Sequence, residues 1–237
     1  MYRNRLQRIF ELRDSLADNS SPNVYFQDYE NLMATNSVAL KHFLDIESDL
    51  TRLDTGAWNH LKKDVMPLFA TRNPKRGWQA AFDKLNQAKA YGYLVDLDCT
   101  RVEFIPESSA KGRKTPDLQG WLGEKHVLCE VKTINISEDE ANARSKPTAR
   151  TIDTQLPHMF FEKLVNTLEV ADQQMRCYDP DDNARRIAYL ILNNFDDILH
   201  EYVEPYQAQL RVFVARVPIP GVEIFFDMKP AYYSAMP

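Results

Sequence analysis

Three charged residues that lie close together in the chain are the best candidates for chemistry. Asp117, Glu130 and Lys132 belong to the segment Thr115–Asn135, and the last two stand in an apolar run typical of a buried strand. Gly123 and the residue after it lie between the aspartate and that run, and they suit a two-residue hairpin turn with glycine at its first central position. The segment therefore predicts two paired strands that carry all three charged side chains.

The predicted turn fixes which residues face each other across the hairpin. If Leu122 pairs with Lys125, the same register continues outward until Asp117 lies opposite Glu130. Side chains on a strand alternate between its two faces, so Glu130 and Lys132 share one face. The prediction is a hairpin with two carboxylates and one ammonium group on the same face.

Two carboxylates that lie opposite each other favour a cation between them. Like charges in direct cross-strand contact destabilise a sheet, and apolar surroundings increase that cost. Magnesium is the natural ion, because it takes one or two protein carboxylates and completes its shell with water and phosphate oxygens. Asp117 and Glu130 are therefore predicted metal ligands. An aspartate followed at loose spacing by Glu-x-Lys also occurs by chance, on hairpins whose charges are simply solvated.

The same residues resemble the motif of the PD-(D/E)xK superfamily, the nucleases of restriction-endonuclease-like fold. Pro116, Asp117, Glu130, Val131 and Lys132 stand at the motif positions. The resemblance implies a nuclease that hydrolyses phosphodiester bonds of DNA with magnesium or manganese. Asp117, Glu130 and the backbone carbonyl of Val131 would hold the metal. Lys132 would orient the attacking water or help to deprotonate it.

Elements on both sides of the hairpin match the order of that fold. A helix is expected at Trp78–Leu94 and a short strand at Arg101–Pro106. After the hairpin, a second helix is expected at Leu156–Arg176 and a further strand at Ile187–Leu192. The resemblance therefore implies an α/β, restriction-endonuclease-like core over residues 74–237, with a central mixed β-sheet flanked by helices.

One position departs from the superfamily pattern. Many relatives carry a glutamate on the first helix near the metal, and the residue that aligns with it here is Gln87. An amide oxygen can still act as a ligand, and Asp83, one helical turn earlier, is an alternative acid. The departure keeps a second hypothesis open, a catalytically degenerate module of the same fold that binds nucleic acid or a protein partner without cutting. A third is an α/β domain in which the motif is coincidental.

The first third of the chain shows helical periodicity. Helices are predicted at Leu6–Leu16, Tyr25–Met33, Ser37–Leu53 and Ala57–Ala70. The run Asn73–Gly77 that follows is rich in residues that break regular structure. We therefore expect an all-helical N-terminal extension over residues 1–73.

Charge bears on the kind of partner. The formal net charge of -5 argues against indiscriminate coating of nucleic acid by a basic surface. Local groups would then hold the phosphates, and the candidates that precede the hairpin are Lys111, Arg113 and Lys114, although such side chains are more often simply solvated. DNA is favoured over RNA by the resemblance alone, and a homodimer would suit the cutting of both strands.

Other features narrow the class of protein. The three cysteines are widely spaced, and neither a zinc-ligand cluster nor a Gly-rich phosphate loop is present. No apolar run is long enough to span a bilayer and no signal-peptide core is seen, so a cytoplasmic protein without a membrane partner is expected. Aromatic residues are usually part of a core, and Trp121 on the hairpin is the one to test for base stacking.

Overall fold

The chain divides into two compact units. The computed structural model describes residues 2–16, 25–70, 72–73, 76–107, 114–135, 155–194, 203–216 and 219–230. The first unit comprises residues 1–104 with 232–237, and the second comprises residues 105–231. The predicted boundary between residues 73 and 74 falls within the first unit.

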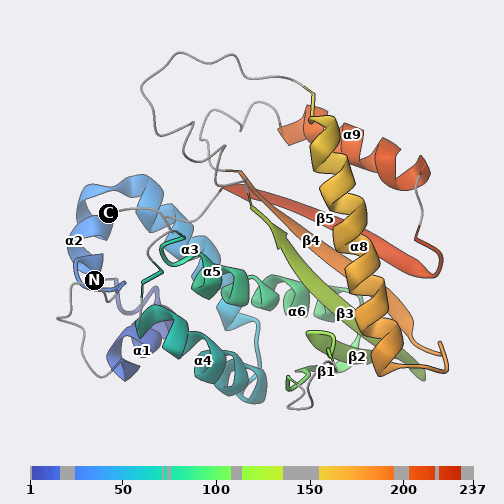
Figure 1. Ribbon diagram of the computed structural model, residues 1–237. Helices are drawn as coiled ribbons and strands as arrows, with labels where there is room; N and C mark the ends of the chain where they lie inside the picture. The colour runs from blue at the N-terminus through green and yellow to red at the C-terminus, as the bar shows by residue number, and fades with distance from the viewer. Residues whose placement is uncertain are drawn as a thin grey trace. The chain divides into compact units, whose positions relative to one another are not determined.

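The described residues of the first unit form helices and one strand (Figure 1). Its described elements are α1 (Gln7–Ser15), α2 (Tyr29–Thr35), α3 (Ser37–Thr51), α4 (Thr55–Ala70), α5 (Gln79–Leu85), α6 (Gln87–Asp96) and β1 (Thr100–Phe104). Asn36 separates α2 from α3, because its side-chain oxygen accepts hydrogen bonds from the amides of Val38 and Ala39, both at 3.0 Å. These bonds cap α3. The four helices predicted up to residue 70 are confirmed, with ends that differ by a few residues.

The prediction of a single helix at Trp78–Leu94 is wrong, because two helices occupy this range. α5 ends at Leu85 and α6 begins at Gln87, with Asn86 between them. The carbonyl of Asn86 accepts from the amide of Lys89 at 3.1 Å, a three-residue spacing that is tighter than the four-residue spacing of an α-helix. Apolar periodicity does not register such a local change of hydrogen bonding.

Aromatic side chains from both sides of the predicted linker pack together in the first unit. The ring centroid of Tyr25 lies 5.7 Å from that of Trp78 and 5.4 Å from that of Phe82. Phe69 lies 5.8 Å from Phe82 in an edge-to-face arrangement, which is favourable beyond the burial of the rings. These contacts join segments before and after Asn73–Gly77 into one core.

The second unit contains a mixed β-sheet. Its strands are β2 (Leu118–Leu122), β3 (Lys125–Ile134), β4 (Arg185–Asn194) and β5 (Val222–Pro230), and they lie in that order. β2 and β3 form an antiparallel hairpin, whereas β3 with β4 and β4 with β5 are parallel. The predicted α/β class with a mixed sheet is therefore confirmed. The sequence patterns do not predict β5.

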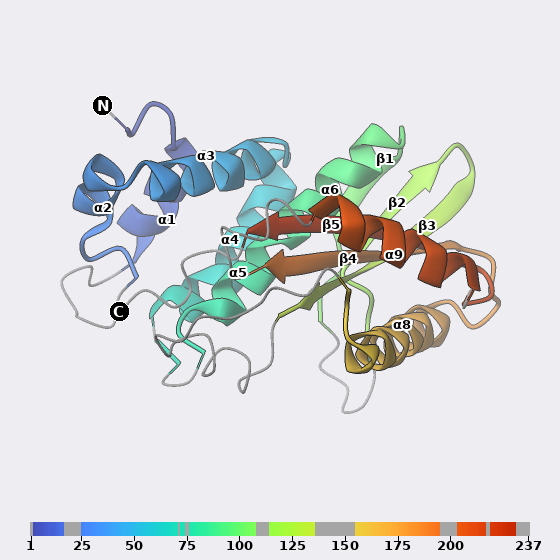
Figure 2. The same cartoon turned by 90° about the horizontal axis from the view of Figure 1, so that it is seen from above.

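Two helices pack on one face of this sheet, α8 (His158–Tyr178) and α9 (Val203–Arg216). α8 runs alongside the strands (Figure 1), and α9 lies next to β5 (Figure 2). The helices meet the sheet through a buried apolar cluster that includes Leu168 of α8, Leu190 of β4 and Leu210 of α9. The predicted helix Leu156–Arg176 and the predicted strand Ile187–Leu192 are confirmed as α8 and β4.

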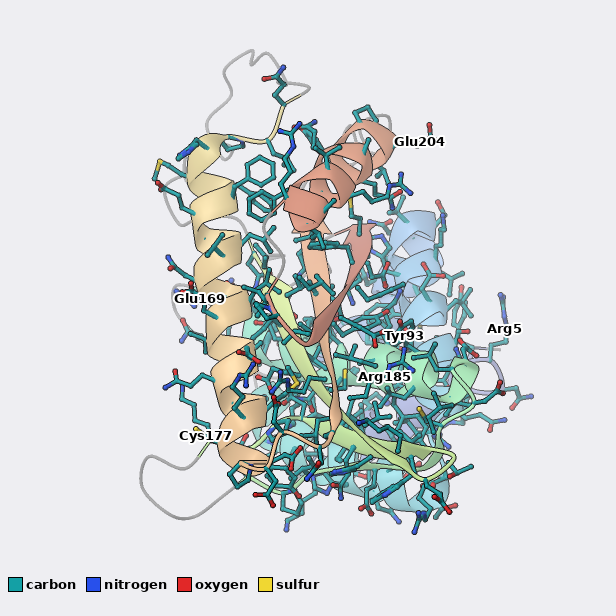
Figure 3. All side chains as sticks on the ribbon, turned by 90° about the vertical axis from the view of Figure 1, so that its right-hand side faces the viewer. Arg5, Tyr93, Glu169, Cys177, Arg185 and Glu204 are labelled. Carbon is teal, nitrogen blue, oxygen red and sulfur yellow. The ribbon has the colours of Figure 1, made fainter. Side chains whose placement is uncertain are left out.

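α8 is amphipathic, because most of its polar residues lie on the side away from the sheet. Glu169 and Cys177 are exposed and point outward from the helix (Figure 3).

In the part of the chain that the structure describes, no helix is both long enough and apolar enough to cross a bilayer.

Candidate active site

The hairpin β2–β3 has the register that the sequence predicts. Leu122 pairs with Lys125 next to the turn, and Leu118 pairs with Cys129 at the other end of the ladder. Gly123 has a φ of 60°, a left-handed conformation that glycine adopts without steric cost and that a two-residue hairpin turn requires. β3 also pairs with β4, so it is an interior strand, and this explains its apolar run.

Asp117 lies one residue before β2 and is held by two backbone contacts. Its carbonyl accepts a hydrogen bond from the amide of Ile105 at 3.0 Å. Its carboxylate Oδ2 accepts from the amide of Val131 at 2.8 Å. The carboxylate therefore reaches across the hairpin to the residue that follows Glu130.

Glu130 is a carboxylate within the core of the second unit, with only 2% of its surface exposed. Its Oε1 accepts from the Nζ of Lys132, whereas its Oε2 is buried and has no hydrogen-bond partner among the described residues. Burial, together with the charge of Asp117, raises the pKa of Glu130 to about 7, against the opposite effect of the Lys132 ammonium. A buried oxygen without a partner is unfavourable, and a bound cation would satisfy it.

Lys132 has a second partner that the sequence analysis missed. Its Nζ donates to the side-chain oxygen of Gln174, on α8, at 2.9 Å. The Nε2 of the same amide donates to the carbonyl of Thr115 at 3.3 Å. One side chain therefore links the lysine of the cluster to the segment that leads into Asp117.

Gln174 stands on the buried face of α8, where every other buried residue is apolar. The buried residues of this helix are Leu164, Leu168, Ala171, Gln174 and Met175. Their spacing of three and four residues defines the stripe that faces the sheet. A buried amide needs hydrogen-bond partners, so one polar residue on an otherwise apolar stripe is the signal by which sequence reasoning could have found it.

The other predicted site residues belong to other segments of the chain. Asp83 belongs to α5 and Gln87 begins α6, both in the first unit, so their accessory role stays a prediction. Lys114 is exposed and precedes the hairpin. Lys111 and Arg113 lie outside the described residues.

The donors that the hairpin offers fit magnesium or manganese. They are the carboxylates of Asp117 and Glu130 and the backbone carbonyl of Val131, all oxygens, which suit hard divalent cations. Within the described ranges, no group of three or more His, Cys, Asp or Glu residues could hold a metal. A cation at the hairpin would thus depend on two carboxylates and complete its shell with water or substrate oxygens. The buried Oε2 of Glu130 is the observation that favours one.

Comparison with known proteins gives no match, whether with protein-family models, with curated proteins or with solved structures. The geometry of the hairpin cluster and of the helix that packs on it is thus the basis for a function.

Proposed function

We propose that this protein is a metal-dependent nuclease with a restriction-endonuclease-like core, which hydrolyses phosphodiester bonds of DNA with Mg²⁺ or Mn²⁺. The observation that carries the proposal is the cluster of Asp117, Glu130 and Lys132 on one hairpin, with Glu130 buried. Apolar residues of similar volume often stabilise a fold as well as a buried ion pair does. Charged groups retained in such surroundings, with a strongly raised pKa, are typical of functional sites.

Each residue of the cluster has a role in this proposal. Asp117, Glu130 and the carbonyl of Val131 hold the metal. A metal bound there would polarise the phosphate of the substrate and lower the pKa of a bound water. Lys132 orients that water through its ammonium group and stabilises the negative charge that develops on the phosphate.

Gln174 is a positioning residue in the proposed reaction. Its amide oxygen fixes the Nζ of Lys132, and its amide nitrogen holds the carbonyl of Thr115. Partners of this kind set the direction of catalytic side chains, and their loss lowers activity although they touch no reacting atom. Lys111, Arg113 and Lys114 are the proposed contacts to flanking phosphates.

Cleavage assays test the proposal. Supercoiled plasmid and labelled single-stranded and duplex oligonucleotides are incubated with native protein and with Mg²⁺, Mn²⁺ or EDTA. Asp117→Asn and Lys132→Ala should abolish cutting, whereas Glu169→Gln, which changes an exposed carboxylate on the outer side of α8, should not. Lys132→Ala leaves Glu130 buried without its cation, so folding is checked by circular dichroism, and Lys132→Gln keeps a donor in a second variant.

A non-cleaving module is the second candidate, and one specific observation favours it. Asp117 is bonded to the amide of Val131, and Glu130 is paired with Lys132, so the charges of the cluster already have partners within the chain. The two candidates differ in one measurable property. Native protein that is folded and binds DNA, but cuts no substrate with either metal, would favour the non-cleaving module.

A further inference from the structure

An aromatic pair extends the face of the hairpin that carries the charged cluster. Trp121 and His126 are direct cross-strand partners, with ring centroids 4.9 Å apart and planes inclined by 25°. Both side chains are only partly buried, so part of the stacked pair is accessible to solvent.

Gln119 and Tyr178 form a small polar network next to the imidazole of this pair. The Oε1 of Gln119 accepts from the Nε2 of His126 at 3.0 Å and from the hydroxyl of Tyr178 at 3.5 Å. The hydrogen bond fixes the plane of the imidazole next to the indole. Burial lowers the pKa of His126, against the opposing charge of Asp179, which favours the uncharged ring next to the indole.

The pair lies on the same face of the hairpin as the proposed active site. Alternate residues of a strand share a face. Gln119 and Trp121 therefore follow Asp117 on the first strand of the hairpin, and His126 lies on the same face as Glu130 on the second strand. Trp121 lies four positions after Asp117, a distance of about 13 Å along the strand. A stacked DNA strand covers this distance with about four nucleotides.

We propose that Trp121 and His126 form a stacking platform for an unpaired nucleobase of the DNA strand that is cut, a few nucleotides from the scissile phosphate. The inference depends on the proposed nuclease function and adds to it a substrate class, DNA with a single-stranded segment. An uncharged aromatic pair suits the face of a base better than it suits a phosphate, and every base offers such a face. Gln119 and Tyr178, which are hydrogen-bonded next to the imidazole, offer polar groups to the edge of that base.

The alternative role of the pair is to stabilise the hairpin, as cross-strand aromatic pairs do. The two roles differ in how DNA binding responds to substitution. A purely structural pair would affect melting and leave the affinity of the folded protein for DNA unchanged. A stacking platform would affect affinity, and the effect would vanish when the stacked base is absent.

Fluorescence anisotropy in EDTA, where no cutting occurs, measures binding of labelled single-stranded DNA of about twelve nucleotides, within the site sizes of known single-strand binders. Trp121→Leu should weaken binding by about ten-fold, because stacking on an aromatic side chain contributes that order of affinity. Trp121→Phe should retain most of it. Phe225→Leu, which changes a partly exposed stacked aromatic residue of β5, is the matched control and should bind as the native protein does.

A second arm identifies the stacked base. Oligonucleotides with one abasic position are compared along the strand, and native protein should lose affinity at one position only. With Trp121→Leu, or with Trp121→Met, which keeps apolar volume against His126, that position should no longer matter. Native affinity in folded Trp121→Leu, or an abasic effect that does not depend on Trp121, would overturn the inference.

The outcomes of the two proposals are separable. Binding that depends on Trp121, with no cutting under any metal, would leave the platform standing and remove the nuclease. Metal-dependent cutting with no effect of the Trp121 substitutions on binding would support the nuclease and remove the platform. Absence of any binding of single-stranded DNA by folded native protein would overturn the platform.

Discussion

Lys132 and Gln174, 42 residues apart in the chain, are joined by a hydrogen bond of 2.9 Å between Nζ and the side-chain oxygen. This bond connects β3, an interior strand of the sheet, to the helix that packs on it. A lysine held by a buried amide on one side and a buried glutamate on the other has little freedom to turn. Such rigidity is expected of a catalytic group and is unnecessary for a solvated surface charge.

Replacement of Gln174 should impair cutting more than folding. Gln174→Leu leaves the carbonyl of Thr115 and the Nζ of Lys132 without their partner, so unfolding free energy should fall by about 1–3 kcal/mol. Single-turnover cleavage at saturating metal should fall about 10- to 100-fold in protein that remains folded. Gln174→Glu, which keeps an acceptor for Lys132, should recover part of the rate. Unchanged cleavage by folded Gln174→Leu would remove its positioning role.

The raised pKa of Glu130 makes stability depend on pH. The folded-state pKa of about 7 lies above the ordinary value of 4.5, so this group's contribution is fully present below about pH 4.5 and is lost as the pH rises through about 7. The difference corresponds to about 3 kcal/mol. Urea unfolding in EDTA should show this loss in native protein, and Glu130→Gln should remove that part of the slope. Equal slopes for the two proteins would contradict the assignment.

Divalent cations should stabilise the second unit through Asp117 and Glu130. Ligand at about 100 times its dissociation constant adds about 2.7 kcal/mol, which raises the melting temperature by roughly 5–10 °C for a chain of this size. Mg²⁺ or Mn²⁺ should produce this shift in native protein and in Glu169→Gln. Asp117→Asn and Glu130→Gln should show none. A shift that survives both substitutions would place the cation elsewhere.

Gly123 should be sensitive to substitution for reasons of backbone conformation alone. A β-carbon added there would meet no atom within 4 Å, but the φ of 60° is unfavourable for a side chain. Gly123→Ala should therefore lower unfolding free energy by about 1 kcal/mol, and Gly123→Asn by less, because asparagine tolerates this region. Chemical denaturation of the three proteins measures the order. Equal stability of all three would argue against the turn.

The parts of the fold that local chemistry determines could be predicted from sequence. The glycine turn and the alternation of side chains define the register of the hairpin, and both depend on neighbouring residues. This is why Glu130 and Lys132 were correctly placed on one face. The apolar run around them indicated an interior strand for the same reason.

Distant contacts, and local changes that leave the apolar pattern intact, could not be predicted in this way. Gln174 reaches Lys132 only because α8 packs on β3. No spacing of residues in the sequence predicts that contact. The break at Asn86 is a local change of hydrogen bonding inside an uninterrupted apolar pattern. The aromatic contacts that connect Tyr25 with Trp78 span a run that composition alone marks as a linker.

The most direct test of the central claim compares metal binding with cutting in Lys132→Ala. If the hairpin is a metal-dependent phosphodiesterase site, native protein should cut DNA with Mg²⁺ and lose all cutting in EDTA. Folded Lys132→Ala should keep the metal-induced rise in melting temperature while its single-turnover cleavage falls at least about 100-fold. Cleavage by Lys132→Ala at the native rate, or folded native protein that cuts no DNA with Mg²⁺ or Mn²⁺, would contradict the account.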